Sequence, residues 1–396
     1  MSAGPKNHQV PSAEVDQVLE ALESQDSPVV IDLRTPKEFA EDHLPGAINL
    51  PIFRNEERAL VGTLYKRESP DRAFEVGREL VAERIGTLFE GIAEAASWDL
   101  PDVDLPARVL EMTSEGIEGL EGGLTEELAE VLPERPVVFH CWRGGLRSRS
   151  VVALLSACGF RRALCLSGGY TQYRRRIITE LEAWQSPGMV VIRGFTGTGK
   201  TLVLRALEQL RPGSTLDLEG FAGHRSSILG MVGLEPVSQK RFESRLATRL
   251  RRLGAQNPGQ RLVVEGESRK IGDRIQPGSV WSGLQAGINV QLVADIERRV
   301  DVLIEDYLDR DGSRAELRAQ LPFIEKRLGP VIWKDRLTGL LDAGEDRELV
   351  RTLLEHYYDP LYTHSERGHE YALTLEMRDP DQAAAQLATF LDGLQG

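Results

Sequence analysis

The stretch VVFHCWRGGLRSRSV, residues 137–151, predicts a strand that ends in a loop and continues as a helix. In such a connection, backbone N–H groups and the positive end of the helix dipole converge on one point, which favours a bound anion. The two glycines allow the backbone to turn tightly. We therefore predict an anion-binding cradle formed by Arg143, Gly144 and Gly145.

Cys141 is predicted to lie at the base of this cradle. A thiol near a helix N-terminus and near arginines is expected to be largely thiolate, which is the nucleophilic form. We therefore predict Cys141 and Arg147 as the catalytic pair. The other two cysteines, Cys158 and Cys165, lie in apolar patterns and are interpreted as packing residues.

Bulk composition limits the class of protein. The chain has 396 residues, enough for two or three domains. Three cysteines are too few for a disulfide framework, and no apolar run forms a signal peptide or a membrane span. These features predict a soluble cytoplasmic protein of unspecified oligomeric state.

The net charge of −13 excludes a general attraction to polyanions, so nucleic-acid contacts must come from local basic patches. Two such patches are candidates for binding RNA phosphates, although each could equally be a solvated helix face. Their candidate residues are Arg174, Arg175, Arg241, Arg245 and Arg249.

The whole chain has an α/β pattern, in which short apolar runs alternate with amphipathic segments. We predict a first domain over residues 1–184, with a charge-rich helical insertion at about 54–130. A Pro- and Gly-containing break at 183–188 precedes a second α/β domain over 188–300. Residues 301–396 are predicted to be helical, without strands.

The second domain opens with a complete phosphate-binding motif, GFTGTGKT at 194–201, between an apolar strand and a helical run. Its glycines free backbone amides to wrap a diphosphate, and its lysine places a positive charge on the phosphates. The predicted diphosphate-binding residues are Gly194, Thr196, Gly197, Thr198, Gly199, Lys200 and Thr201.

Mg²⁺ is the predicted cofactor of this loop, because a hydroxyl and a carboxylate at a strand end are suitable ligands. Thr201 and Asp217 are the candidate ligands. Glu219, two residues after Asp217, and Glu265 and Glu267, at the end of another apolar run, are weaker candidates.

The cysteine loop also matches HCx5RS over His140–Ser148, the signature of protein tyrosine phosphatases. The upstream run IDLRTPKEFAEDHLPGAINLP, however, resembles the first half of rhodanese-like domains, which handle sulfur or selenium on a cysteine. The six-residue spacing from Cys141 to Arg147 is similar to that of rhodanese-fold phosphatases and suits a tetrahedral, phosphate-sized group.

The ordered set CWRGGLRS, GFTGTGKT, DLEGFAGHRSS, QKRFES, VVEGESRKIG and YYDPLY resembles the tRNA 2-selenouridine synthase family. The resemblance covers nearly the whole chain. It implies a rhodanese-like domain joined to a P-loop domain, with Cys141 as the essential cysteine. It also implies replacement of sulfur by selenium in wobble 2-thiouridine of tRNA, with selenophosphate as donor. The same enzyme would geranylate that sulfur from geranyl diphosphate, held at the P-loop.

The chain departs from the family pattern at Gly266, where VEGES replaces VEDES, and at Ser226, where HRSS replaces HRGS. The first change removes a carboxylate next to Glu265 and Glu267. Three alternatives remain open from the residues alone: a rhodanese-fold phosphatase or sulfurtransferase, a P-loop kinase or NTPase with a sulfur-binding module, and a non-enzymatic tRNA-binding module. Whether Cys141 carries selenium covalently or only binds the donor is also open.

Overall fold

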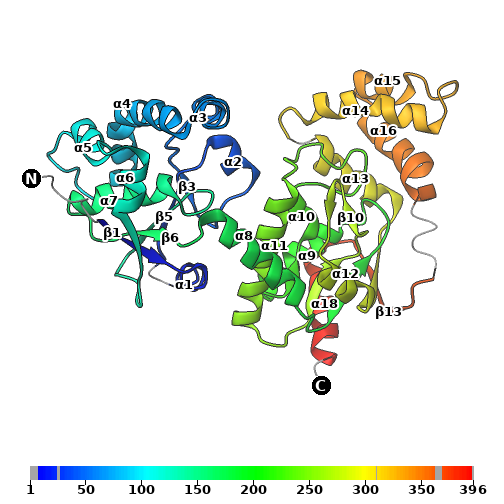
Figure 1. Cartoon of the computed structure of the whole chain (residues 1–396). Helices are drawn as coiled ribbons and strands as arrows, with labels where there is room; N and C mark the ends of the chain where they lie inside the picture. Colours follow the sequence, from blue (N-terminus) through cyan, green and yellow to red (C-terminus); the bar gives the residue numbers. More distant parts are fainter. Residues whose placement is uncertain (1–7, 25–26, 309, 362–367, 395–396) are drawn as a thin grey trace, which may run out of the picture. The chain divides into compact units, whose positions relative to one another are not determined.

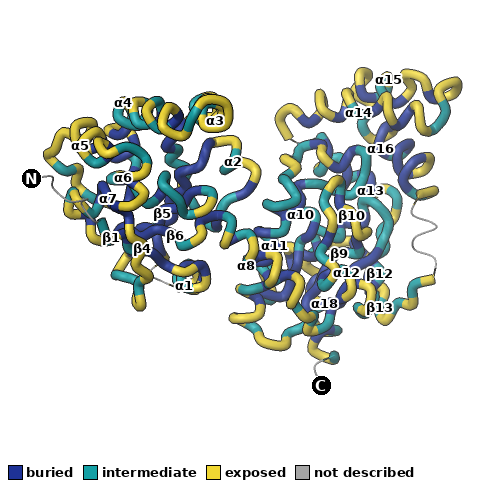
Figure 2. Tube along the Cα trace, viewed as in Figure 1, coloured by how far each residue is buried: buried dark blue, intermediate teal, exposed yellow. Residues whose placement is uncertain are grey.

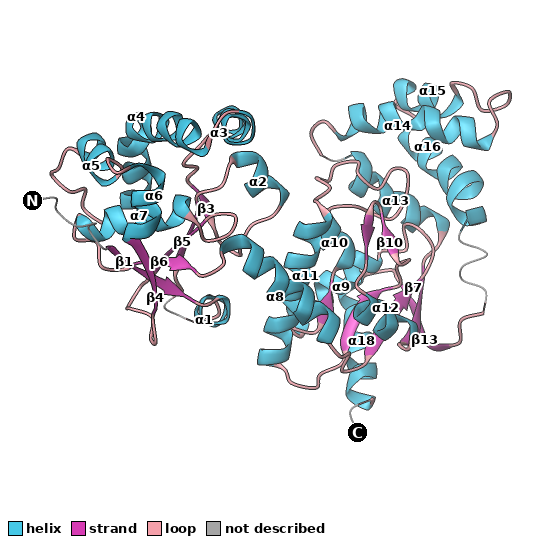
Figure 3. Ribbon diagram, in the orientation of Figure 1, coloured by secondary structure: helices cyan, strands magenta, loops and turns pink. Residues whose placement is uncertain are grey.

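The computed structural model describes residues 8–24, 27–308, 310–361 and 368–394. The chain divides into two compact units, Met1–Thr179 and Glu180–Gly396 (Figure 1). Each unit has its own parallel sheet with helices packed against it (Figure 3), so the α/β class predicted from the sequence is confirmed.

The first unit is built on a six-stranded sheet with the order β3-β2-β5-β6-β1-β4. All of its pairings are parallel. Parallel strands buried on both faces read as continuous apolar runs, as β5 and β6 do. The strands are β1 His8–Ala13, β2 Val29–Asp32, β3 Ile48–Asn49, β4 Leu124–Leu128, β5 Val137–His140 and β6 Ala163–Leu166.

Helices cover this sheet, and four of them lie between β3 and β4 in the sequence. The long α4 is exposed along part of its length (Figure 2). Its Ile85, Phe89 and Ile92 are buried in the core of the unit. The helices are α1 Val15–Ala21, α2 Pro36–Glu41, α3 Asn55–Arg67, α4 Pro70–Ala96, α5 Leu105–Met112, α6 Gly116–Gly123, α7 Leu146–Ala157 and α8 Gly169–Ala183, the last of which crosses the unit boundary.

Residues 124–128 depart from the helical periodicity predicted up to about 130. They form β4, which pairs in parallel with β1 at the edge of the sheet. Four of the five β4 residues are exposed, so the strand lacks the apolar signature of its central neighbours.

The second unit holds a five-stranded parallel sheet with the order β13-β12-β7-β9-β8. Its strands are β7 Met189–Arg193, β8 Thr215–Leu216, β9 Leu262–Glu265, β12 Ile288–Val293 and β13 Tyr371–Glu376, and a small hairpin joins β10 Lys270–Ile271 to β11 Arg274–Ile275. The helices of this part are α9 Lys200–Leu210, α10 Leu218–Ala222, α11 Gln239–Gln256, α12 Gly278–Gln285 and α18 Pro380–Gly393.

A helical lobe lies between β12 and β13 in the sequence and has its own apolar core. It contains α13 Ile296–Leu308, α14 Ser313–Leu328, α15 Arg336–Ala343, α16 Asp346–Leu353 and a π-helical turn, η1 Leu354–Tyr358. The prediction that no strand follows residue 300 is wrong, because the chain returns from this lobe to add β13 to the sheet. The final helix α18 then packs its apolar side into the core of the sheet.

None of the helices in the described ranges is long and apolar enough to cross a membrane.

Candidate functional site

The cysteine loop joins β5 to α7 at the carboxyl end of the first sheet. Cys141 directly follows β5, and Gly145 is the N-cap of α7. Gly144 has a φ of 64°, and a Cβ there would lie 3.0 Å from the backbone nitrogen of Gly168. The strand, the tight turn and the helix therefore occur where the sequence predicts them.

A second glycine-containing segment, which the sequence analysis did not single out, holds this loop from the start of α8. The Tyr170 N–H donates to the Cys141 carbonyl at 2.9 Å, and the Thr171 N–H donates to the Trp142 carbonyl at 2.9 Å. Gly169 packs so closely that a Cβ there would collide with Gly144 and with the Cys141 carbonyl. The paired glycines before Tyr170, in the run LSGGY, were the available signal.

The Cys141 sulfur lies in a closed, polar setting, since the residue is only 2% exposed. Its Sγ is 3.3 Å from Ser148 Oγ and 3.9 Å from the Gly145 carbonyl oxygen. Burial raises the pKa of the nearby Cys165 thiol far above its ordinary value, so Cys165 stays protonated. Only Cys141 of these two belongs to the loop.

The arginines of the loop differ in their surroundings. Arg143 is exposed, whereas Arg147 is half-buried with Nη1 3.8 Å from Glu38 Oε2. That Nη1 has no hydrogen-bond partner among the described residues. Arg149 instead donates to the Leu124 carbonyl at 2.5 Å and so ties α7 to β4.

A buried ion pair lies against Tyr170, the residue whose N–H holds the cysteine loop. Arg34 Nη2 lies 2.6 Å from Asp32 Oδ2, and the same nitrogen donates to the Asp42 carbonyl at 2.6 Å. The guanidinium also stacks 3.8 Å from the ring centre of Tyr170. Burial would raise the pKa of Asp32, but the charges of neighbouring His140, when protonated, and of Arg34, together with the Arg34 hydrogen bonds, hold it below its ordinary value.

His140, the last residue of β5, pairs with Asp32 across the sheet and is fully buried. Burial lowers its pKa from 6.5 to about 4 and outweighs the opposing effect of Asp32. The imidazole is therefore neutral near pH 7. Its Nε2 lies 3.6 Å from Asp32 Oδ2, but a neutral ring forms no ion pair with the carboxylate at that pH.

The phosphate-binding loop connects β7 to α9 in the second unit. Lys200 Nζ donates to the Gly194 carbonyl at 2.9 Å, so the lysine folds back over the loop. Gly199 is the N-cap of α9, with a φ of 83°. Cβ atoms on Gly194 and Gly199 would collide with the Leu292 carbonyl and the Met377 side chain. The loop thus has the form expected for wrapping phosphates.

The remaining motif residues stabilise this loop. The Thr198 hydroxyl donates to the Phe195 carbonyl at 2.9 Å, and the Thr196 carbonyl accepts from Arg299 Nε at 2.9 Å. Gly197 has a φ of 79°, a conformation that favours glycine. Thr201 lies in the first turn of α9.

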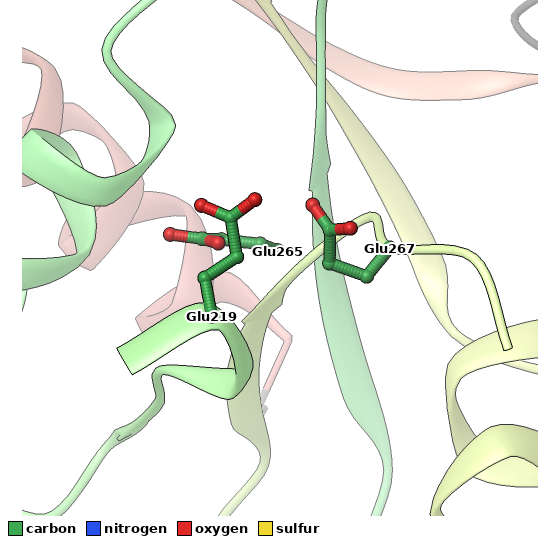
Figure 4. Close-up of side chains that lie close together, drawn as sticks. All are labelled: Glu219, Glu265 and Glu267. Carbon is green, nitrogen blue, oxygen red and sulfur yellow. The ribbon is translucent and has the colours of Figure 1, made fainter. Parts of the chain in front are cut away.

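Three glutamates converge in the second unit (Figure 4), and one of them, Glu265, lies close enough to Lys200 and Thr201 of this loop to interact with both. Glu219 comes from α10, Glu265 ends β9, and Glu267 follows it; one carboxylate oxygen from each lies within 4.8 Å of the others. Both oxygens of fully buried Glu265 have no hydrogen-bond partner among the described residues. Burial, then the charges of Asp217 and Glu267, raise the pKa of Glu265 to about 8, although Thr201 and Lys200 act in the opposite direction.

This arrangement favours a divalent cation, because oxygen ligands are what Mg²⁺ prefers and because a cation would relieve the repulsion. Asp217 is not one of the three; its Oδ1 caps α10 by accepting from the Gly220 N–H at 2.7 Å. Ser226 donates a hydrogen bond to Glu267. Glu219, a weaker candidate than Asp217 from the sequence, lies in the first turn of this short helix and supplies the third carboxylate.

The basic candidates are only partly available for RNA. Arg249 bonds to Glu208 at 2.7 Å and to the Thr215 carbonyl, and Arg245 reaches the Phe221 carbonyl at 3.4 Å. These contacts tie α11 to its neighbours. Arg174, Arg175 and Arg241 lie on α8 and α11, and Arg175 is exposed.

Comparison with known proteins gives two matching family models. Residues 187–389 match the tRNA 2-selenouridine synthase AAA domain, which is more than half of the chain, and residues 14–76 match the rhodanese-like domain. The chain belongs to the tRNA 2-selenouridine synthase family. Both domain types predicted from the sequence are thereby confirmed. The rhodanese match ends within α4, which belongs to the helical insertion, and so does not reach the cysteine loop.

Curated relatives match along most of their length. The chain is 32% identical to the tRNA 2-selenouridine synthase of Pseudomonas syringae pv. syringae, with 93% of this chain and 96% of the relative covered. It is 29% identical to that of Bdellovibrio bacteriovorus, covering 89% and 92%, and 28% identical to that of Nitrosomonas europaea, covering 87% and 90%. The chain is thus an enzyme of tRNA modification.

Proposed function

We propose that this enzyme converts wobble 2-thiouridine of tRNA to 2-selenouridine in two half-reactions, each carried out at one of the two loops. The proposal is supported by the occurrence of two strand–loop–helix connections in one chain of this family, one containing Cys141 and the other Lys200. A nucleotide-binding module alone would not require the cysteine loop.

In the first half-reaction, the nucleoside sulfur attacks C1 of geranyl diphosphate. The C1–O bond breaks, diphosphate leaves with the electron pair, and the nucleoside loses its N3 proton. Lys200 and the loop amides from Gly194 to Thr201 bind the diphosphate. The product is S-geranyl-2-thiouridine, whose sulfur is now a better leaving group.

In the second half-reaction, the selenium of selenophosphate attacks C2 of the S-geranylated base. The C2–S bond breaks, geranyl thiolate leaves and takes up a proton, and water cleaves the P–Se bond to release phosphate. Arg143, Arg147, Gly144 and Gly145 bind the phosphate part of the donor, and Cys141, at the base of the loop, orients its selenium.

Mg²⁺ fits the three-glutamate cluster, because the three carboxylates converge and neither oxygen of buried Glu265 has a hydrogen-bond partner in the part of the chain that the structure describes. When bound there, it would neutralise charge developing on the departing diphosphate. Thr201 lies beside Glu265 and would complete the site.

The tRNA partner is bound through its phosphates. Exposed Arg175 and its neighbour Arg174 are the proposed contacts in α8, and Arg241, Arg245 and Arg249 are those in α11. Because Arg245 and Arg249 also hold their own helix in place, they contribute less to RNA binding than Arg175.

The test is to incubate purified protein with 2-thiouridine tRNA and to analyse the digested nucleosides by mass spectrometry. Geranyl diphosphate alone is expected to give the S-geranyl nucleoside, and adding selenophosphate is expected to give 2-selenouridine. Neither product would appear if the proposal were wrong. Cysteine-dependent turnover of an aryl phosphate in its place would favour a phosphatase.

A further inference from the structure

A cavity of about 1330 Å³ lies in the first unit between the helical insertion and α7. It exceeds the roughly 300–1,000 Å³ that drug-sized ligands occupy. Side chains from α3, α4, α5 and α6 form one side, and residues of α2 and α7 form the other. Apart from Arg147, its lining residues have no role in the function proposed so far.

The interior of the cavity is apolar. Its walls include Phe53, Val61, Phe74, Val81 and Met112. Phe74, Val81, Val61 and Met112 are only half-buried although they adjoin the core of the unit, so an apolar ligand could cover them further.

The cavity also reaches the cysteine loop. Leu146 and Arg147, the first two residues of α7, line it. They directly follow Gly145, whose carbonyl oxygen lies 3.9 Å from Cys141 Sγ. An apolar ligand here would therefore lie beside the site of selenium transfer.

Charged side chains around the cavity favour an anionic ligand at its polar parts. Six cations line it, Lys37, Arg58, Lys66, Arg67, Arg78 and Arg147, against four glutamates, Glu38, Glu56, Glu118 and Glu121. The Arg78 Nε and Arg147 Nη1 atoms are buried without hydrogen-bond partners among the described residues. The local excess of positive charge contrasts with the net charge of −13 for the chain.

We infer that this cavity holds the geranyl chain of the S-geranylated wobble nucleoside while selenium replaces its sulfur. The inference rests on the proposed function and adds a site for the intermediate. Selenophosphate is small and polar and would not need apolar walls, whereas a branched ten-carbon chain attached to RNA needs both an apolar interior and cations for its flanking phosphates. Geranyl diphosphate itself has the P-loop.

The first test measures binding of synthetic anticodon stem-loops that carry S-geranyl-, S-dimethylallyl- or S-methyl-2-thiouridine. Wild-type protein is expected to bind the S-geranyl RNA on the order of 100-fold more tightly than the S-methyl RNA, because the longer chain buries more apolar surface. Equal affinities for the three RNAs would overturn the inference.

The second test fills the cavity with Val61→Trp and uses Leu60→Trp as the matched control. Val61 lines the cavity, whereas adjacent Leu60 is 50% exposed and does not. Val61→Trp is expected to reverse the preference, so that the dimethylallyl RNA binds at least as well as the geranyl RNA, and Leu60→Trp is expected to keep the wild-type order. A misfolded variant would lose affinity for all three RNAs and could not reverse the order of affinities. In that case the affinities of the wild-type protein for the three RNAs test the inference.

Measuring the rates of the two half-reactions separately distinguishes a failure of this inference from a failure of the proposed function. Val61→Trp is expected to slow selenation of S-geranyl RNA at least tenfold while geranylation of 2-thiouridine RNA stays unchanged. Slowed geranylation would mean that the cavity holds geranyl diphosphate, which contradicts the inference but not the proposed function. If wild-type protein catalysed neither step, the proposed function would fail, and the chain-length series would still test the cavity.

Discussion

Replacing His140 by phenylalanine is expected to reduce the loss of stability that the first unit undergoes between pH 7 and pH 4. The imidazole is fully buried, and burial lowers its pKa from 6.5 to about 4. As the pH falls below 6.5, His140 becomes protonated in the unfolded chain but stays neutral in the folded chain. The free energy of unfolding therefore declines until about pH 4. A difference of about 2.5 pKa units corresponds to roughly 3 kcal/mol.

Asp32 acts in a different pH range. Its pKa is held below the ordinary value of 3.8, so the stability it contributes is present above pH 3.8 and is lost only below it. Of these two residues, therefore, it is mainly His140 that lowers the free energy of unfolding between pH 6.5 and 4. Phenylalanine shifts the absolute stability through packing, but it does not titrate.

The assay uses the cysteines, because Cys141, Cys158 and Cys165 all lie in the first unit. A pyridyl disulfide reagent, which reacts with thiols at low pH, would report urea-induced exposure of that unit alone. Wild-type protein is expected to lose about 3 kcal/mol more than His140→Phe between pH 7 and 4. Equal losses in the two proteins would refute the assignment of a neutral buried histidine.

Three further predictions follow from the contacts around the two loops. Arg34→Met should destabilise the first unit by about 3–5 kcal/mol in the same assay, because it leaves the Asp32 charge buried and unpaired; a loss below about 1 kcal/mol would contradict this. Gly169→Ala should lower the rate of selenation at least tenfold and leave geranylation unchanged, because the added Cβ would displace the cysteine loop. Selenation at the wild-type rate would show that Gly169 does not pack tightly against that loop. Mg²⁺ at about 100 times its Kd should stabilise the wild-type second unit by about 2.7 kcal/mol in thermal unfolding. Glu265→Gln should remove much of that gain and exposed Glu235→Gln should not; the metal assignment fails if both respond alike.

The two loops could be located from the sequence because their signals are local. A strand, glycines with positive φ and a helix start occur within about ten residues in each case, as at Gly144 and Gly199. The chemistry at each loop follows from residues inside the same short segment. No knowledge of distant contacts was needed.

Contacts between distant segments were not predictable in this way. β13 pairs with β12 across a whole helical lobe, and Gly169 meets the cysteine loop from another element. The sequence also pointed to Asp217 as a metal ligand, because a carboxylate at a strand end suits that role. That carboxylate caps α10, while the same short helix brings Glu219 to Glu265.

The most direct test of the central claim is nucleoside mass spectrometry of 2-thiouridine tRNA treated with Cys141→Ser or Lys200→Ala in the presence of both small-molecule substrates. We predict that Cys141→Ser accumulates S-geranyl-2-thiouridine without 2-selenouridine, and that Lys200→Ala forms S-geranyl-2-thiouridine at least tenfold more slowly. Formation of 2-selenouridine at the wild-type rate by Cys141→Ser, or of S-geranyl-2-thiouridine at the wild-type rate by Lys200→Ala, would contradict the division of the reaction between the two loops.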